Sequence, residues 1–451
     1  MNGNWDGLKR IRLWLAPGMG VKRHLLLAIS GGILLVLGAV GWGLWAFDAD
    51  RAQLAGPIES ALRSGPWSRF GGWATTGVAL LGLGLVVVAV GRLNRSLLSN
   101  WLPHPDDAVR LLHRKVALAK GPRVVGIGGG SGLSNLLRGL RKHTSNLTAV
   151  VAVSDDGGSS GRLRQAFDMP APGDLTDCLA ALSDNESELA RLLQYRFARG
   201  RELDGHTFGN LLITTVTEVE GDFGNALRLM NRLLALSGSV YPATAEPVTL
   251  LVEKESGELV RGETSLRAVP GAVRALATEP AEPRGLPEVE RAVLAADLIV
   301  LGPGSLFSST IPPLLVPSVL AAVNRSAARL VYVCNIMTEA GETDGFDAFD
   351  HVAALERHGV RPPDIVLLNS APVDRARVES YRGEAAEVVA PAAARFAAAG
   401  MVTLELPLLG GGPVAQHDSD KLAAVLADIA VASARSTSNE ARAHARPGAA
   451  A

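Results

Sequence analysis

Two long apolar runs stand near the start of the chain. Leu25–Phe47 has 23 residues without a charge, and Phe70–Val90 has 21. As helices they would be about 35 Å and about 32 Å long, enough to cross a hydrocarbon core of about 30 Å. The first run is also longer than the apolar part of a signal peptide, which is about 7–15 residues. The pattern therefore predicts a two-helix transmembrane hairpin over residues 25–91.

Basic and aromatic residues at the ends of these runs favour one orientation. The basic flanking residues are Lys9, Arg10, Arg12, Lys22 and Arg23 before the first run, and Arg92, Arg95 and Arg110 after the second. In the connecting segment, Asp48–Arg69, three arginines are offset by three acids. Because Lys and Arg concentrate on the cytoplasmic side, we expect residues 1–24 and the chain after residue 91 to face the cytoplasm. This predicts a multi-pass protein of the inner membrane.

Beyond a connector over residues 92–121, short apolar runs alternate with helical patterns. The expected strands are Arg123–Ile127, Thr148–Val153, Asp297–Leu301, Leu330–Val333 and Asp364–Leu368. The expected helices are Ser131–Lys142, Glu188–Arg199, Gly221–Leu236, Leu286–Ala296, Pro317–Arg325, Ala348–His358 and Ser419–Val431. Continuous apolar strands separated by helices predict an α/β fold, a Rossmann-like, mostly parallel sheet with helices on both faces. We place this domain at residues 122–432.

Two further segments depart from the alternation. Val248–Glu253 and Leu259–Glu263 flank Ser256-Gly257, which predicts a small β-hairpin inserted into the domain. Residues 433–451 are rich in Ala, Ser and Arg without periodicity, and we expect this tail to be disordered.

Composition narrows the possible functions. Lys and Arg number 44 against 45 Asp and Glu, so the chain has no excess positive charge, and we expect no nucleic-acid partner. Apolar residues make up 47% of the chain, which agrees with a membrane part. The two cysteines, Cys178 and Cys334, are too few for a disulfide framework or a Cys-rich zinc site, and both are expected to be reduced core residues.

Glycine-rich loops follow two of the expected strands. The first contains Gly128, Gly129, Gly130 and Ser131, and the other contains Gly302, Gly304 and Ser305. Glycines let a backbone approach a phosphate closely, and the N-terminus of a following helix offers unpaired N–H groups. No Gly-Lys-Ser/Thr follows, which excludes a Walker-type loop. A tight strand–helix turn without a ligand is the alternative.

Paired acids open a further loop after the second expected strand. Asp155 and Asp156 run directly into Gly158, Ser159 and Ser160. Amides and hydroxyls in such a loop can hold phosphate oxygens, and one carboxylate, Asp155 here, could meet a Mg²⁺ bound to the same oxygens. Alternatively, either aspartate only caps a turn.

Other polar residues follow the same pattern of loops after strands. His206 and Asn210 open a helical stretch, and Asn335 and Thr343 follow a later strand. In open α/β sheets, ligands bind beyond the carboxyl ends of the strands, so these loops are expected to meet at one ligand site. Thr343 could instead cap the helix that starts near Asp347. Asp174 is interpreted as either another acid of the site or a helix cap.

Six motifs in order resemble the YvcK/CofD-like family, which includes gluconeogenesis factors and 2-phospho-L-lactate transferases. They are GIGGGSGL (126–133), SDDGGSSGRLR (154–164), APGDLTDCLAAL (171–182), GHTFGNLL (205–212), GPGSLFSSTIPPLL (302–315) and CNIMTEAGETDGF (334–346). The last two, with YPATAEPVTL (241–250), look closer to the gluconeogenesis-factor branch. The resemblance covers about Arg123 to Val431 and leaves the first 120 residues outside.

The resemblance implies a nucleotide-sugar partner, UDP-N-acetylglucosamine or UDP-glucose, and a link to cell shape and peptidoglycan precursors. It implies that Gly128–Gly130, Asp155, His206, Asn210 and Asn335 line the nucleotide site, and that Tyr381 lies near the sugar. Where the family often has Arg-His-Asp, this chain has Gln416-His417-Asp418. Cell-wall synthesis proteins and a homo-oligomer are further expected partners.

Four functions are compatible with these features to different degrees. A membrane-tethered, non-catalytic regulator that binds a nucleotide sugar explains both the motifs and the apolar runs. The alternative enzyme is a Mg²⁺-dependent transferase acting on a nucleotide diphosphate, as in 2-phospho-L-lactate transferase. An NAD-dependent oxidoreductase is disfavoured by the paired acids, since that fold places one acid at the ribose. A structural membrane scaffold would need no ligand.

Overall fold

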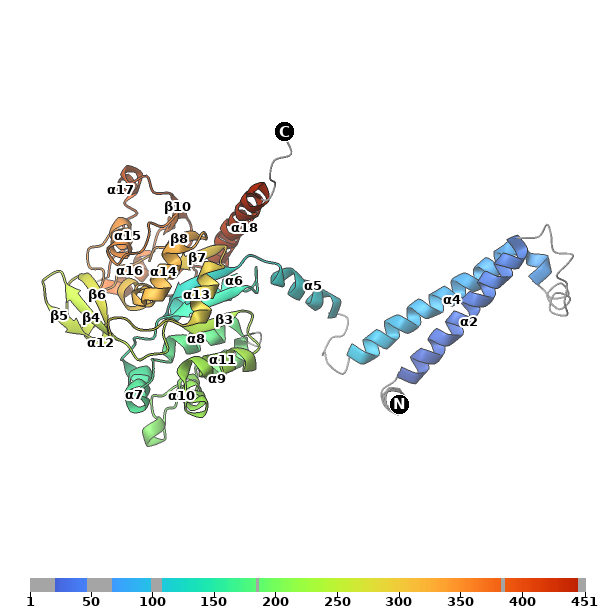
Figure 1. Cartoon of the computed structure of the whole chain (residues 1–451), viewed down its shortest axis with the longest axis horizontal. Coiled ribbons are helices and arrows are strands. Elements are labelled where there is room, and N and C mark those ends of the chain that lie inside the picture. The colour runs from blue at the N-terminus through green and yellow to red at the C-terminus, as the bar shows by residue number, and fades with distance from the viewer. Residues whose placement is uncertain (1–20, 47–66, 99–107, 184–185, 383–385, 445–451) are drawn as a thin grey trace. The chain divides into compact units, whose positions relative to one another are not determined.

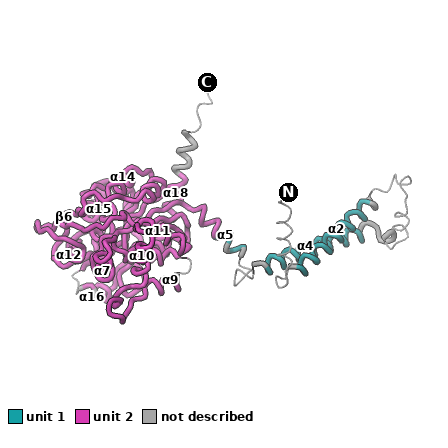
Figure 2. The backbone as a smooth tube through the Cα atoms, turned by 60° about the horizontal axis from the view of Figure 1, so that its bottom comes forward, with its two compact units in different colours: residues 1–114 teal, residues 115–451 magenta. Residues whose placement is uncertain are grey.

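The computed structural model describes residues 21–46, 67–98, 108–183, 186–382 and 386–444. The chain divides into two compact units, Met1–Arg114 and Lys115–Ala451 (Figure 2).

Unit 1 is a pair of long helices, α2 (Val21–Ala46) and α4 (Trp67–Leu98), which run side by side (Figure 1). Small residues let their backbones touch. A Cβ on Gly38 would lie 2.5 Å from the Ala79 nitrogen, and one on Gly82 would lie 2.5 Å from the Leu35 nitrogen. Such close contact is typical of helix pairs in membranes.

The surface of this helix pair is apolar. Leu26, Val36 and Leu80 are each about three-fifths exposed. The segments Lys22–Gly43 and Trp73–Ser96 are long and apolar enough to cross a membrane, so the two predicted helices are confirmed. The connecting residues 47–66 lie outside the described ranges.

Unit 2 is built on a seven-stranded sheet in which every pairing is parallel. Its order is β10-β9-β8-β7-β1-β2-β3. The strands are β1 (Val124–Gly128), β2 (Leu147–Val151), β3 (Ser239–Pro242), β7 (Leu298–Leu301), β8 (Arg329–Val333), β9 (Ile365–Asn369) and β10 (Thr403–Leu406). The five predicted strands are confirmed, and the sequence analysis missed the two edge strands. Strand order reverses between β1 and β7, which makes the gap beyond their carboxyl ends the switch point where ligands bind in such sheets.

Helices cover both faces of this sheet, as predicted. They are α6 (Gly130–Leu140), α7 (Gly158–Phe167), α8 (Gly173–Leu182), α9 (Glu186–Leu193), α10 (Phe208–Glu220), α11 (Phe223–Leu233), α12 (Glu263–Ala268), α13 (Pro287–Leu294), α14 (Pro317–Arg325), α15 (Ala348–Arg357), α16 (Arg375–Arg382), α17 (Ala393–Ala398) and α18 (Ser419–His444), with α5 (Ala108–Ala119) before the sheet. Short turns are η3 (Arg201–Leu203), η4 (Leu306–Thr310) and η5 (Pro312–Leu315).

Alternate residues of β1 enter different cores. Val124 packs with Leu136 and Leu179 of α6 and α8, whereas Val125 packs with Val289 and Val319 of α13 and α14. Strands buried on both faces in this way read as continuous apolar runs, which is why the pattern was recognisable.

The predicted hairpin is part of a three-stranded antiparallel sheet. β4 (Thr249–Lys254) pairs with β5 (Leu259–Arg261) on one side and with β6 (Val273–Glu279) on the other. Lys254 is fully buried, and its Nζ donates to the backbone carbonyls of Leu266, Gly271 and Gly341. One side chain thus links this small sheet to the loop that follows β8.

The expectation of disorder from Ser433 onward is wrong for residues up to His444. There α18 continues as a helix, and residues 445–451 lie outside the described ranges. Ala, Arg and Glu are strong helix formers, so a segment without an apolar stripe can extend a helix that is already nucleated. That helix is anchored on α6, where a Cβ on Gly139 would lie 2.2 Å from the Ser419 carbonyl oxygen.

Candidate functional site

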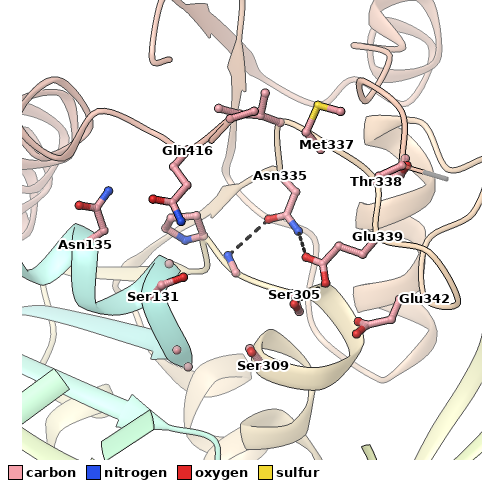
Figure 3. Close-up of a pocket in the computed structure, with 18 of the residues that line it drawn as sticks. Ser131, Asn135, Ser305, Ser309, Asn335, Met337, Thr338, Glu339, Glu342 and Gln416 are labelled. Carbon is pink, nitrogen blue, oxygen red and sulfur yellow. Dashed lines mark hydrogen bonds between the residues drawn. The ribbon is translucent and has the colours of Figure 1, made fainter. Parts of the chain in front are cut away.

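A cavity of about 780 Å³ opens beyond the carboxyl ends of β1, β7 and β8 (Figure 3). Its lining residues come from segments far apart in the sequence. They are Gly129–Gly132, Asn135, Asp155, Asp174, Glu263, Arg267, Pro303–Ser305, Ser309, Asn335–Ala340, Glu342, Tyr381, Ala386 and Ala415–His417. Of the predicted site residues, Gly129, Gly130, Ser131, Asp155, Gly304, Ser305, Asn335 and Tyr381 line it. The predicted meeting of loops at one rim of the sheet is therefore found.

The loops after β1 and β7 pack backbone against backbone. A Cβ on Gly132 would lie 2.3 Å from the Pro303 carbonyl oxygen, closer than real side chains come. Gly128 and Gly302 do not line the cavity but lie behind it, where a Cβ on Gly128 would be 3.9 Å from the Gly302 Cα. Gly130 has a φ of +56°, a conformation that favours glycine. The glycines thus bring two backbones to one wall of the cavity.

The N-terminus of α6 faces this cavity. Its N-cap, Gly129, has no side chain to satisfy the first N–H groups of the helix, and Gly130–Gly132 line the cavity. A Cβ on Gly129 would lie 2.1 Å from a carboxyl oxygen of Asp174. The Gly130 N–H donates to that carboxyl group. An anion therefore already approaches this helix end, which is where phosphates bind in related sheets.

Asp174 does not act as the N-cap of α8, which is Pro172. Burial, followed by the charges of Asp155 and Asp177, raises the pKa of Asp174 to about 7. This carboxyl group therefore changes charge near neutral pH within the cavity. Of the two interpretations of Asp174 from the sequence, a helix cap or an acid of the site, the structure favours the second.

Asn335, after β8, connects the opposite walls of the cavity. The Gly304 N–H donates to its Oδ1 at 3.3 Å, and its Nδ2 donates to Glu339 Oε1 at 3.2 Å (Figure 3). The Ser305 hydroxyl donates to the same carboxylate. These bonds hold the loop after β7 against the loop after β8.

Acids outnumber cations around the cavity. Arg267 on α12 contacts Glu263 at 3.4 Å and the buried Glu342 at 3.2 Å. Burial, followed by the charge of Asp155, raises the pKa of Glu263 to about 9, because the nearby Arg267 only partly offsets those effects. Carboxyl groups that stay protonated limit the negative charge that a bound anion would meet.

The described residues include no group of three or more His, Cys, Asp or Glu side chains placed to hold a metal ion. Asp155, the candidate for Mg²⁺, already accepts a hydrogen bond from the Gly157 N–H at 2.9 Å. The described protein residues therefore do not supply a complete set of metal ligands.

Several predicted residues lie next to the cavity rather than on its wall. Ser159 at the start of α7 bonds to His206 Nδ1 at 3.0 Å, and Asn210 Nδ2 donates to Ser159 at 3.1 Å and to Ser160 at 3.4 Å. Thr176 donates to Asn210 Oδ1 at 3.0 Å. This buried network fixes α7, α8 and α10 together. Ser160 connects this network to the cavity. A Cβ on Gly173 would lie 2.5 Å from the Ser160 hydroxyl oxygen and 3.6 Å from a carboxyl oxygen of Asp155, which lines the cavity.

The remaining predicted residues have local structural partners. Asp156 accepts from the Thr264 N–H and hydroxyl at 2.8 and 2.7 Å, so it holds the start of α12. Gly158 begins α7 with a φ of +50°. Thr343 is buried, and its hydroxyl accepts from the Glu339 N–H at 2.8 Å. The cap of α15 is Asp347, not Thr343.

Other lining residues were absent from the predicted set. Glu339 and Glu342 stand inside a motif that the resemblance used, so the signal for them was present. Glu263 and Arg267 come from α12, a short helix with no distinctive pattern. His417 also lines the cavity; burial lowers its pKa to about 4, and its Nε2 has no hydrogen-bond partner among the described residues.

Comparison with known proteins gives the relationship. The profile of the family described as 2-phospho-L-lactate transferase CofD matches residues 124–409. A crystal structure of a Bacillus halodurans protein has a TM-score of 0.66 and 40% sequence identity, covering 68% of this chain and 99% of that one. The fold of unit 2 is therefore one already seen in that protein.

Curated relatives extend the match. Gluconeogenesis factor of Bacillus subtilis is 39% identical over 310 residues, which is 68% of this chain and 98% of its own length. A Deinococcus radiodurans relative is 44% identical over 433 residues, 93% of this chain and 90% of its own. That match is longer than unit 2, so it reaches into the N-terminal region, which the motifs left outside the resemblance. The chain belongs to the CofD/YvcK family, and its curated relatives are gluconeogenesis factors.

Proposed function

We propose that the cavity of unit 2 binds a nucleoside diphosphate sugar, UDP-N-acetylglucosamine or UDP-glucose, and that binding regulates peptidoglycan precursor supply and cell shape without turnover. The observation that carries this is the meeting of two glycine loops, after β1 and β7, on one wall of the cavity. Gly130, Gly132 and Gly304 carry no side chain, so their backbone lines the cavity directly. Proteins of cell-wall synthesis are the partners that this role requires.

The chemistry of the lining suits the two parts of such a ligand. The first turn of α6 offers N–H groups and the positive end of a helix dipole to the diphosphate. Ser131 and Ser309 add hydroxyl donors on the same side (Figure 3). Carboxyl and amide groups such as Glu339 and Asn335 can pair with sugar hydroxyls. A volume of about 780 Å³ lies within the usual range for ligand sites.

Calorimetry tests this proposal on the full chain in lipid nanodiscs. We expect heat on titration with UDP-N-acetylglucosamine or UDP-glucose, and a loss of most of that heat in Asn335→Ala, which releases the loop after β7. Gly411→Ala is the matched control, since a Cβ there meets open space. No heat with either sugar nucleotide at millimolar concentration would reject the proposal.

We further propose that α2 and α4 span the inner membrane, with both ends on the cytoplasmic side. Their length and apolar surface support the spans, and the basic flanks favour this orientation. Cys178 and Cys334 are buried, so a cysteine placed at Ser60 would be the reactive one. A membrane-impermeant maleimide should label Ser60→Cys from the outside of intact cells, and labelling only after lysis would contradict the orientation.

A Mg²⁺-dependent transferase is the second candidate function. The position of Asp155 on the wall of the cavity favours it, because a single carboxylate together with substrate phosphates can hold Mg²⁺ in such enzymes. On this alternative Asp155→Asn should abolish transfer of the substituted phosphate from the nucleotide. Unchanged turnover in that variant would dismiss the role of Asp155.

A further inference from the structure

Helix α5 (Ala108–Ala119), which contains the sequence boundary between the two units, exposes an apolar face. Val109, Leu112 and Val116 are 77%, 65% and 46% exposed. Their spacing of three and four residues places them on one side of the helix. Three large apolar side chains in a row on an exposed helix indicate a surface that is covered by something else.

The charge of α5 has a single sign. Arg110, Arg114 and Lys115 are its charged residues at neutral pH, and it contains no Asp or Glu. Arg110 and Arg114 are four residues apart, on the side opposite Leu112. A helix with one apolar face and a basic opposite face is typical of helices that lie in the interface of a membrane with anionic lipids.

Covalent geometry keeps this helix close to the proposed span. α4 ends at Leu98 and α5 begins at Ala108. The ten Cα-to-Cα steps from Leu98 to Ala108 span at most about 35 Å even when the chain is fully extended. The start of α5 therefore cannot leave the neighbourhood of the bilayer surface if α4 crosses the membrane.

We propose that α5 lies along the cytoplasmic surface of the bilayer. Val109, Leu112 and Val116 enter the boundary between headgroups and acyl chains, and Arg110 and Arg114 pair with anionic headgroups. This inference rests on the proposed membrane anchoring and adds a second, interfacial contact to it. A protein partner on the same face is the competing occupant. It is disfavoured because an all-basic helix tethered near a bilayer has an anionic surface within reach.

The contact has a consequence for unit 2. The Ser145 N–H donates to the Leu118 carbonyl oxygen at 3.1 Å, and Asn146 Nδ2 donates to the Ala119 carbonyl oxygen at 3.0 Å. These bonds fix the end of α5 to the loop that precedes β2. A helix held at the lipid surface would thereby restrict the rotation of unit 2 instead of leaving it on a free tether.

Spin labels on single introduced cysteines test this in the full chain. The protein is reconstituted in nanodiscs of phosphatidylcholine with phosphatidylglycerol, and the native cysteines are buried. Collisions with oxygen report lipid, and collisions with a water-soluble nickel chelate report solvent. We expect oxygen to dominate at Leu112→Cys and Val116→Cys, and nickel to dominate at Arg114→Cys.

A label on α4 separates this inference from the anchoring on which it rests. A Cβ on Gly84 meets open space, so Gly84→Cys is tolerated and should report lipid. If Gly84 reports lipid while Leu112 reports solvent, the α5 proposal is wrong and the anchoring stands. If Gly84 reports solvent, the anchoring itself fails. Shielding of Leu112 from both reagents would mean that protein covers the face, which also overturns the proposal.

The role of the arginines has its own readout. Arg110→Gln with Arg114→Gln should lower the ratio of lipid-bound to released α5 by about fivefold for each arginine. The Leu112 label measures that ratio. The drop is expected in anionic nanodiscs and not in nanodiscs of phosphatidylcholine alone. An equal ratio in the variant and the parent chain in anionic nanodiscs would refute headgroup pairing.

Discussion

Glycines allow two backbones to touch in both units, but with different results. In unit 1, Gly38 lets α2 meet α4, and all N–H groups there belong to helix interiors. In unit 2, Gly132 lets the loop after β1 meet the loop after β7, at the first turn of a helix. Helix interiors have no spare donors, whereas first turns do. The same close approach therefore makes a packing seam in one unit and a candidate anion site in the other.

Gly132→Val should have the largest effect, because its Cβ would meet the Pro303 carbonyl oxygen at 2.3 Å. We expect the two loops to separate and sugar-nucleotide binding to fall below detection in calorimetry. Overpacking of this kind costs about 1–3 kcal/mol of folding free energy. Gly412→Val is the control, since nothing lies within 4 Å of that position. Binding at the parental affinity in Gly132→Val would show that the loop contact is not needed.

Gly38→Leu should break the seam in unit 1 without touching the cavity. The added side chain would meet the Ala79 backbone, so we expect the helix pair to loosen by about 1–3 kcal/mol. Disulfide trapping between one cysteine on α2 and one on α4 in nanodiscs measures the pairing. Gly32→Leu, whose Cβ meets open space, should leave it unchanged. A fall in sugar-nucleotide affinity in Gly38→Leu would contradict the independence of the two regions.

Ligand affinity should depend on pH through Asp174. Its pKa, raised to about 7, leaves the carboxyl group neutral in acid and charged in base. A bound diphosphate is repelled only by the charged form. Affinity should therefore be constant below about pH 7 and weaken by up to about tenfold per pH unit above it.

Calorimetry between pH 6 and pH 8, below the raised pKa of Glu263, checks this dependence. Asp174→Asn should abolish it and keep the affinity of the acidic range, and neutral uridine should show none in the parent chain. A flat profile for the parent chain with a diphosphate ligand would mean that Asp174 does not contact the anion.

Gln416→Arg should have the smallest effect. Gln416 lines the cavity, and a guanidinium at this position could form two parallel hydrogen bonds to a diphosphate. We expect affinity for the sugar nucleotide to rise by about tenfold or less, since one exposed charge pair contributes about 1 kcal/mol. Titration calorimetry measures it, with Gln416→Lys as the control for charge without fork geometry. No gain in either variant would place the diphosphate away from Gln416.

Much of the fold follows from local patterns. The two long apolar helices, the five inner strands and the hairpin were predictable because apolar runs and turn residues are visible within a short stretch of sequence. The edge strands β3 and β10 were not, since Ser239–Pro242 and Thr403–Leu406 are too short and mixed in polarity to form such a run. The end of α18 was missed because helix formers without an apolar stripe resemble a disordered tail.

The sequence by itself determined which loops are candidates for binding a phosphate, because a glycine-rich turn that follows an apolar strand can be recognised from adjacent residues alone. Only the tertiary structure decided that α12 brings Glu263 and Arg267 to the same cavity, and that Ser159, His206 and Asn210 form a network beside it. These arrangements depend on contacts between segments far apart in the sequence, such as the hydrogen bond between Thr264 of α12 and Asp156, 108 residues apart. Such contacts are selected by the packing of the whole sheet and leave no periodicity in any one segment.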